Sequence, residues 1–147
     1  MRVVHPRAGL IVAGKGGAWG RMWPLFRLGL GGRLGNGSQY WSFVSLRDEV
    51  TAIRRMLDDE SKSGAYNVTA PNPATNGEIT AAMGSLLHRP TFARVPKFAL
   101  RTVLGEMSSE VLGSARVLPT RLTEASFTFA DPTIERALAT ALAEPQP

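Results

Sequence analysis

Residues 29–37 contain three glycines, Gly29, Gly32 and Gly35, at the spacing of a dinucleotide-binding loop. In such a site a strand ends at the glycines and a helix begins after them, so that backbone N–H groups and the helix dipole meet a pyrophosphate. No strand pattern precedes these glycines, and an extended segment at residues 40–45 follows them. We therefore interpret residues 29–37 as a flexible loop on the substrate side of a site and not as a cofactor fingerprint.

A second glycine pattern, Gly9-x-x-x-x-Gly14-Lys15, has the spacing of the phosphate-binding loop of nucleoside triphosphatases. That loop needs a Ser or Thr after the lysine to hold Mg²⁺, and here Gly16 follows. The glycines after Lys15 are also a poor opening for a helix. The sequence therefore argues against a nucleoside triphosphatase.

The sequence also gives little evidence for an acid–base or metal site. His5 and His88 lie far apart without ligand spacing, and residues 58–60, Asp-Asp-Glu, are typical of a solvated helix end. Neither Tyr40 nor Tyr66 is followed four residues later by a lysine, so the Tyr-x-x-x-Lys pair of many dehydrogenases is absent. We expect no catalytic residue and no metal ligand in this chain.

Charge is distributed unevenly along the 147 residues. Residues 1–47 hold seven Lys and Arg residues and no acid, which favours an anionic partner. Aromatic residues are interleaved with these cations, but no RNA-binding or zinc-finger pattern accompanies them, so nucleic acid is an unlikely partner. The sequence has no cysteine, which fits a reducing compartment, and no long apolar run, which excludes a membrane span. We expect a cytoplasmic protein.

The N-terminal part predicts one buried strand at residues 2–4, its exit at residues 9–12, and a glycine-rich irregular segment at residues 14–38. The only helical piece expected in that segment is at residues 22–28. An extended run then leads to Ser45, whose hydroxyl can cap a helix. The apolar residues of that helix predict a buried stripe, formed by Val50, Ile53, Met56 and Leu57.

The C-terminal part predicts a strand at residues 65–70, a helix opened by the capping box Thr75-x-x-Glu78, and a strand at residues 91–95. A strand, a helix and a strand over about thirty residues indicate a βαβ unit with parallel strands. Further helices are expected at residues 98–104, at residues 107–118, and after Asp131, with Asp131 as N-cap and Pro132 in the first turn. Residues 145–147 should fray.

Four stretches together resemble the C-terminal half of extended short-chain dehydrogenase/reductase proteins of the NAD-dependent epimerase/dehydratase-like, or nucleoside-diphosphate-sugar epimerase, family. They are "GLGGRLGNGSQYWSFVSLRDEV", "GAYNVTAPNPATNGEIT", "LHRPTFARVPKFALRTVLGEM" and "RVLPTRLTEASFTF". The resemblance covers nearly the whole chain. Two positions depart from it, because Ser45 and Ser126 stand where relatives usually have His and Gly.

The resemblance implies an α/β chain with a partial Rossmann-type fold. The last strands of the sheet would be joined to a helix-rich substrate-side domain with a small parallel βαβ unit. It divides the chain into residues 1–64, with the late Rossmann strand, glycine loop and helix, and residues 65–147, the C-terminal substrate-side domain. The glycine fingerprint and the Tyr-x-x-x-Lys pair of the family would both precede Met1, in an N-terminal Rossmann half.

The resemblance also implies a role for particular residues. Arg7, Ala8 and Gly9 would be the cofactor-facing residues, on the nicotinamide side of NAD or NADP. The glycine loop at residues 29–37 and the run at residues 40–49, which contains Ser45, would line the substrate cleft. From their charge and shape, Lys15, Arg33 and Trp41 are candidate contacts for a small, anionic or nucleotide-linked substrate; solvated cations and a core tryptophan are the alternative.

Two functions follow from this reading. The first is the substrate-binding half of an NAD(P)-dependent epimerase or reductase, inactive without a cofactor-binding half and without cofactor affinity of its own. The second is a non-enzymatic binding or scaffold protein that keeps the fold of that family. The first strand would have bare edges in either case, because no βα unit of this chain precedes it.

Overall fold

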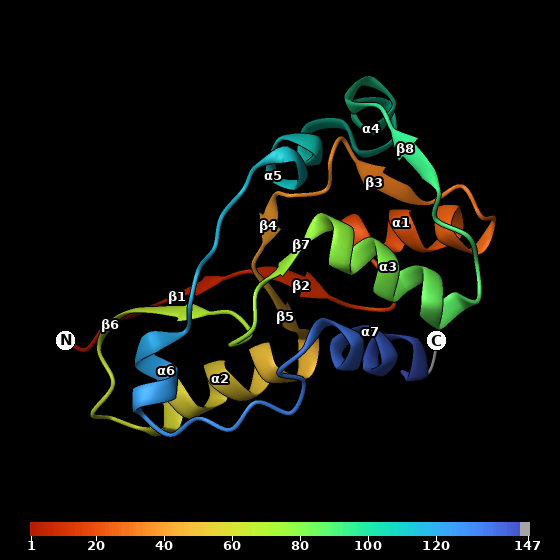
Figure 1. Ribbon diagram of the computed structural model, residues 1–147. Coiled ribbons are helices and arrows are strands. Elements are labelled where there is room, and N and C mark those ends of the chain that lie inside the picture. The colour runs from red at the N-terminus through yellow and green to blue at the C-terminus, as the bar shows by residue number, and fades with distance from the viewer. Residues whose placement is uncertain (145–147) are drawn as a thin grey trace.

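The computed structural model describes residues 1–144, without the side chains of residues 103, 104, 107, 110 and 111. Residues 145–147, the expected frayed tail, lie outside that range. The described elements are, in chain order, β1 (Val4–Ala8), β2 (Leu10–Val12), α1 (Gly17–Arg27), β3 (Gly32–Leu34), β4 (Tyr40–Trp41), β5 (Phe43–Ser45), α2 (Leu46–Asp58), β6 (Gly64–Val68), β7 (Ala74–Thr75), α3 (Asn76–Leu87), β8 (Ala93–Val95), α4 (Lys97–Leu104), the 3₁₀ turn η1 (Gly105–Met107), α5 (Ser108–Leu112), α6 (Thr120–Glu124) and α7 (Ile134–Ala143) (Figure 1).

Within the described part, the strands pair two by two. β1 pairs with β6, β2 with β5 and β3 with β8, all in parallel, whereas β4 and β7 are antiparallel. The α/β class with parallel strands is therefore confirmed. The predicted pairing of residues 65–70 with residues 91–95 is wrong, because β6 and β8 pair with earlier strands and not with each other.

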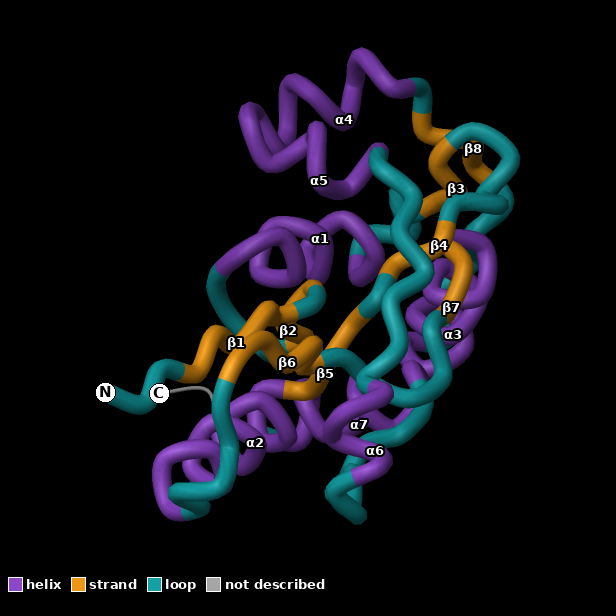
Figure 2. The backbone as a smooth tube through the Cα atoms, turned by 90° about the vertical axis from the view of Figure 1, so that its left-hand side faces the viewer, coloured by secondary structure: helices purple, strands orange, loops and turns teal. Residues whose placement is uncertain are grey.

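Helix α2 leads into β6, which pairs in parallel with β1. Helix α2 lies along one face of this pair (Figures 1 and 2). Ala52 and Met56 of α2 pack with Val4, Tyr66 and Val68 of the two strands in one hydrophobic cluster. The other edge of β1 is bare, since no second strand of the described residues pairs with it.

Helix α1 is longer than predicted. The sequence predicts a helical piece only at residues 22–28, but the helix runs over Gly17–Arg27 and contains Pro24. Its buried side chains recur at the spacing of one helix face, and this burial outweighs the weak helix propensity of its glycines and proline. These buried residues are Ala18, Trp19, Met22, Trp23 and Phe26. They belong to the main core, to which α3, α4 and α7 also contribute.

The buried face of α2 differs from the predicted stripe. Of the four predicted residues only Met56 is buried; Val50 is 51% exposed and Leu57 is 68% exposed, and Ile53 is also exposed. The face toward the strands is formed instead by Asp48, Glu49, Ala52 and Met56.

Two of the three predicted helix caps are confirmed, those at Ser45 and Thr75. The Ser45 hydroxyl accepts a hydrogen bond from the Asp48 N–H at 3.3 Å, at the start of α2. At the start of α3, the Thr75 hydroxyl accepts from the Glu78 N–H, and the Glu78 carboxylate accepts from the Thr75 N–H at 2.7 Å. At its other end, α2 is capped by Arg2, whose guanidinium donates to backbone carbonyls of Met56, Leu57 and Asp59.

The C-terminal part differs from the prediction in three places. Helix α5 ends at Leu112, and residues 113–118 form an extended strap to α6, a helix that was not predicted. Helix α7 begins at Ile134 with Thr133 as N-cap, so the prediction of Asp131 as N-cap is wrong. Asp131 is instead fully buried in a polar network, which its sequence position does not reveal. No helix of the described residues is long and apolar enough to cross a membrane.

Candidate functional site

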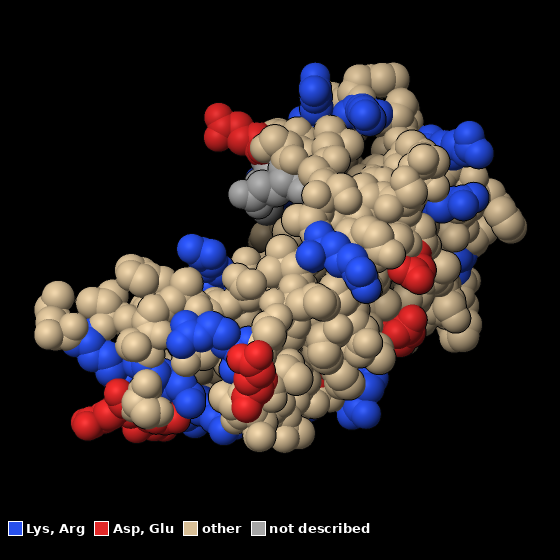
Figure 3. Space-filling view, turned by 60° about the vertical axis from the view of Figure 1, so that its left-hand side comes forward, with Lys and Arg blue, Asp and Glu red and all other residues tan. Residues whose placement is uncertain are grey.

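A cleft of about 700 Å³ lies at the carboxyl ends of β1 and β6, beneath the strap of residues 113–118. Ligands of parallel α/β sheets bind outside the carboxyl ends of the strands, and this volume suits a small ligand. The space-filling view shows a concave outline between the lobe of α4 and α5 and the lobe of α2 and β1, with cationic side chains on both (Figure 3). The cleft is lined by Arg7, Ala8, Gly9, Leu10, Tyr40, Trp41, Ser42, Asn67, Thr69, Ser109, Gly113, Ser114, Ala115 and Val117.

The end of β1 is fixed to two neighbouring segments. The Gly9 N–H donates to the Val68 carbonyl at 3.0 Å, and the Leu10 N–H donates to the Ser42 carbonyl at 2.8 Å. A Cβ atom on Gly9 would lie 2.6 Å from that same Ser42 oxygen. Residue 9 therefore has to be glycine for the chain to pass from β1 to β2 at this distance.

The strap is held over the strands by Ser42. The Ser42 hydroxyl donates to the Ala115 carbonyl at 2.7 Å and accepts from the Val117 N–H at 2.8 Å. The Thr69 hydroxyl donates to the Val117 carbonyl, and the Asn67 amide donates to the Leu118 carbonyl. These bonds fix the backbone of the strap, which forms one wall of the cleft and belongs to no helix or strand.

The cleft has an electropositive and aromatic rim. Arg7 lies at the end of β1, directly opposite Asn67 in the strand register. The Arg116 guanidinium lies over the Tyr40 ring, 5.6 Å from its centroid. No carboxylate is among the described residues that line the cleft. An anionic ligand would therefore meet cations and hydrogen-bond donors without competition from a protein anion.

The same residues fit only one end of a dinucleotide. Arg7, Ala8 and Gly9 lie at the carboxyl end of a parallel strand, where a nicotinamide ring can be held. A pyrophosphate needs a glycine turn that opens a helix, and no such turn is among the described residues of the cleft.

The structure brings four of the seven predicted site residues together. Arg7, Ala8, Gly9 and Trp41 line the cleft, with Trp41 itself only 3% exposed. Ser45 does not line the cleft; it is buried at the end of β5, where it caps α2.

The two predicted cations lie elsewhere. Lys15 lines a separate hollow of about 530 Å³ at the start of α1, together with Arg21 and Arg27. Arg33 lines a third hollow of about 270 Å³, beside Thr80 and Phe92. Neither is in the lining of the cleft.

The resemblance placed residues 40–49 at the cleft, and Tyr40, Trp41 and Ser42 of this run do line it, whereas no residue of the glycine loop at 29–37 does. Sequence reasoning missed Asn67 and Thr69. A signal for Asn67 and Thr69 was present, because both lie at the end of a predicted strand, where parallel α/β proteins place their ligands. Nothing local marked the bonds of Ser42 to the strap, since its partners are 73 and 75 residues away in the chain.

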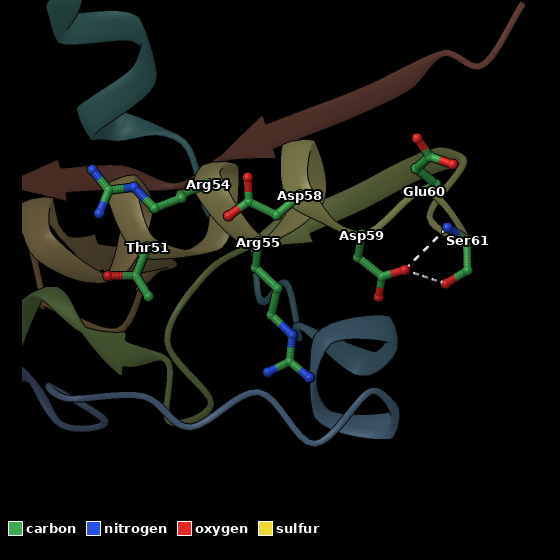
Figure 4. A pocket seen from close by; sticks show the side chains of 7 residues that line it. All are labelled: Thr51, Arg54, Arg55, Asp58, Asp59, Glu60 and Ser61. Carbon is green, nitrogen blue, oxygen red and sulfur yellow. Dashed lines mark hydrogen bonds between the residues drawn. The ribbon is translucent and has the colours of Figure 1, made fainter.

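A further open hollow, of about 710 Å³, lies at the C-terminal end of α2, but its charged side chains do not converge (Figure 4). Arg55 donates to the carbonyls of Ala125 and Ser126. Asp59 accepts from the hydroxyl and the N–H of Ser61, and the hydroxyl bond is the main reason why the pKa of Asp59 is lowered to about 2. Arg55 and Asp59 are thus held by local partners and do not form a common binding site with the other charged side chains of the hollow.

Similarity to known proteins gives the cleft its context. A family model described as a domain of unknown function (DUF1731) matches residues 95–141. An epimerase family protein of Mycobacterium leprae is 43% identical over 145 residues, which are 98% of this chain and 47% of that protein. The crystal structure of a human epimerase family protein with NADPH has a TM-score of 0.89 at 30% identity and matches 97% of this chain and 49% of the human one.

The chain is similar to proteins of this epimerase family in sequence and in fold. It corresponds to the C-terminal half of the family's proteins and spans about half the length of the curated relatives that it matches. A nucleoside-diphosphate sugar epimerase of Corynebacterium glutamicum has the same fold over 99% of this chain, with a TM-score of 0.73 at 29% identity and 27% of its own chain covered. The resemblance stated from the sequence is thereby confirmed.

Proposed function

We propose that this chain is the substrate-side half of an NAD(P)-dependent epimerase- or reductase-like enzyme. The observation that carries the proposal is the cleft at the carboxyl ends of β1 and β6, which has Arg7 on its rim and no carboxylate in its described lining. The ligand proposed for it is a small anionic molecule, of which a nucleotide sugar is the best example. NAD or NADP would be bound mainly by the family's N-terminal half, with Arg7, Ala8 and Gly9 as the contribution of this chain.

The cofactor supplies hydride transfer when it is bound, and the residues of this chain position the substrate beside it. Arg7 is suited to hold a phosphate or carboxylate, because a guanidinium presents two parallel donors. Asn67 and Thr69 supply further polar contacts at the strand ends, and the strap excludes water from above. The acid that exchanges a proton with substrate would belong to the N-terminal half, since the described lining of the cleft holds no histidine, carboxylate or lysine.

A second candidate is a binding or scaffold protein without activity. It is favoured by the same cleft lining, which has hydrogen-bonding groups but no histidine, carboxylate or lysine among the described residues. The two candidates differ in whether the addition of a cofactor-binding half gives catalytic activity.

The test is a binding titration in three samples: this chain, this chain co-expressed with the N-terminal half of the Mycobacterium leprae relative, and the same complex with Arg7→Ala. We expect UDP-glucose to bind the chain weakly, and NADPH to bind the complex but not the chain alone at sub-millimolar concentration. Arg7→Ala should weaken UDP-glucose binding by about tenfold, the contribution of one charged hydrogen-bonding partner. Arg33→Ala is the matched control, because Arg33 lies outside the cleft.

The proposal fails if the complex binds neither NADPH nor UDP-glucose. The scaffold candidate replaces it if the complex binds UDP-glucose and NADPH but neither epimerises nor oxidises or reduces a substrate. Micromolar binding of NADPH by the chain alone would show that its own glycine segments hold the cofactor.

A further inference from the structure

The outer end of the lobe that contains α4, β3 and β8 carries cations without acids (Figure 1). Two segments meet there, because β3 and β8 pair in parallel and a bridge between Gly32 and Phe92 extends their contact. Residues 27–34 contain two Lys and Arg residues, residues 88–102 contain four, and neither segment contains an Asp or Glu. Cationic side chains lie along the top and right margin of this lobe (Figure 3). Such a surface favours an anionic partner.

Two of these cations lie side by side in the sheet. Arg33 of β3 and Arg94 of β8 are register partners, so their side chains leave the strands on the same face. The opposite face holds Leu34 and Val95, which pack in the main core. Like charges directly opposite each other in a sheet are destabilising, and no described acid forms an ion pair with either arginine. An anion from outside the chain would relieve this repulsion.

Large apolar side chains protrude among the cations. Phe92 is 94% exposed, and it lines the same hollow of about 270 Å³ as Arg33. Phe98, in the first turn of α4, is 74% exposed. Leu28 and Leu30, in the loop that precedes β3, are also largely exposed. Apolar side chains that gather on one exposed surface indicate an interaction site.

Helix α4 presents the same combination of side chains on its outer face. Among its described side chains only Leu100 is buried, and Lys97, Phe98 and Arg101 are exposed. At about 100° per residue these three lie within an arc of about 100°, and Leu100 is about 160° from Phe98. A helix face with an aromatic ring flanked by cations is typical of helices that lie at a membrane surface.

We propose that this end of the lobe is a docking surface for an anionic lipid bilayer. We call it the basic face; it consists of Arg33, Phe92, Arg94, Lys97, Phe98 and Arg101. Its cations bind the phosphates and carboxylates of the lipid headgroups, and its two rings enter the boundary between headgroups and acyl chains. None of its residues is in the described lining of the cleft, so the proposal goes beyond the proposed function and does not depend on it.

A bilayer fits the basic face better than a nucleic acid does. Both would neutralise the cations, but nucleic acids derive their remaining affinity from bases that stack on aromatic rings, commonly in a groove that follows the strand. The basic face lies at the end of a lobe, and Leu28 and Leu30 beside it cannot stack on bases. At a bilayer these two side chains leave water together with the phenylalanines.

The test is sedimentation of the chain with phosphatidylcholine vesicles that contain about 30% phosphatidylserine, so that the bilayer surface is negative. Vesicles of phosphatidylcholine alone are the control. We expect the chain to pellet with the anionic vesicles and not with the neutral ones. Salt of about 1 M should release it, because the Debye length then falls to about 3 Å.

The role of charge is tested with the double variant Arg94→Glu, Lys97→Glu. Its partition onto anionic vesicles should fall by at least about tenfold, because each cation near such a surface contributes about fivefold. The matched control is Arg54→Glu, Arg136→Glu, which has the same net charge but changes exposed residues of α2 and α7. We expect this control to pellet with the anionic vesicles as the unmodified chain does.

Insertion of the rings is tested at unchanged charge with Phe92→Ser, Phe98→Ser. This variant should also partition at least about tenfold more weakly, since two apolar side chains no longer leave water. The chain has no cysteine, so a polarity-sensitive dye can be attached to Thr102→Cys, one turn after Phe98 on α4. Its emission should shift to the blue with anionic vesicles, whereas the dye on Ala139→Cys of α7 should not change. Circular-dichroism melting verifies that each variant folds.

Several results would overturn the proposal. Equal pelleting with neutral and anionic vesicles would remove the role of charge, and an equal loss in the Arg54 and Arg136 control would remove the role of this surface. A single-stranded oligonucleotide that binds through Arg94 and Lys97, without vesicle binding, would assign the basic face to nucleic acid. A dimer that Phe92→Ser, Phe98→Ser converts to a monomer, without vesicle binding, would assign it to a second copy. Binding of UDP-glucose and NADPH is measured separately, so the proposed function holds or fails independently.

Discussion

The guanidinium of Arg47 holds the carboxylate of Asp131 through two hydrogen bonds of 2.6 Å each. Asp131 is fully buried, and its carboxylate also accepts from the Thr140 hydroxyl at 2.9 Å. The Asp131 N–H in turn donates to Asp48. This network ties the first turn of α2 to the segment that leads into α7, and it explains how α2 buries polar residues on the face where apolar ones were expected.

Removing Arg47 should therefore destabilise the fold. Arg47→Ala leaves a buried carboxylate without its main partner, and we expect the free energy of unfolding to fall by about 2 to 3 kcal/mol in urea titrations. Arg54→Ala, an exposed change on the same helix, should cost less than about 0.5 kcal/mol. Equal effects of the two changes would mean that the Arg47 pair contributes nothing specific.

The same pair predicts loss of stability in acid. Burial raises the pKa of Asp131, but the hydrogen bonds from Arg47, Ser45 and Thr140 outweigh it, so the pKa lies below the ordinary value of 3.8. A group with a lowered pKa in the folded state contributes its stability above the unfolded value and loses it as the pH falls through the folded value. We expect the melting temperature to drop below about pH 4. Asp131→Asn should melt lower at pH 7 and show a smaller acid drop.

Glu49 predicts the opposite pH dependence for the chain alone. Glu49 is buried, and its Oε2 atom has no hydrogen-bond partner among the described residues. Burial raises the pKa of Glu49 above its ordinary value of 4.5. The folded state then binds this proton more tightly than the unfolded state, so stability is present in acid and is lost as the pH rises through the folded pKa. Glu49→Gln should melt at a higher temperature than the unmodified chain at pH 7, and at a similar temperature near pH 4. A lower melting temperature at pH 7 would contradict the unpartnered carboxylate.

The capping box of α3 predicts a smaller effect. Thr75→Ala removes the hydroxyl that accepts from the Glu78 N–H, and we expect a loss of about 1 kcal/mol in unfolding free energy with no change in ligand affinity. Thr123→Ala, on the exposed face of α6, is the control. A melting temperature equal to that of the control would show that the box contributes nothing.

Ser42 predicts a local effect on the strap. Ser42→Ala leaves the Ala115 carbonyl and the Val117 N–H without their partner, which should cost about 1 to 2 kcal/mol. We also expect faster cleavage within residues 113–118 in limited proteolysis, because the strap has no helix or strand of its own. Ser85→Ala, an exposed change on α3, should leave the cleavage pattern as it is.

Local features of the fold could be predicted from the sequence, and features that depend on distant partners could not. The caps at Ser45 and Thr75 depend on residues three positions away, and both were found. The partners of β6 and β8 are set by tertiary packing, so the pairing of the predicted strands with each other was wrong. The predicted buried stripe of α2, residues 50, 53, 56 and 57, has the spacing of a core face. The face that is buried contains Asp48 instead, which accepts hydrogen bonds from backbone N–H groups more than 80 positions away.

The candidate site could be predicted only where it coincides with the family resemblance. Arg7, Ala8, Gly9 and Trp41 line the cleft, and their roles toward a cofactor and a substrate stay predictions. Trp41 also belongs to the hydrophobic core, the alternative that the sequence left open. Lys15 and Arg33 were chosen for charge alone, and charge does not determine which side of a molecule a loop residue reaches. For this reason both residues lie outside the cleft lining.

The cap that Arg2 places on α2 joins two segments that lie far apart in the sequence. The Arg2 guanidinium donates to the carbonyls of Met56 and Leu57, 54 and 55 positions later, and so ties the residues ahead of β1 to the last turn of α2. Loss of these bonds should therefore loosen both segments together. Their amide hydrogens are then expected to exchange with solvent as one cooperative unit.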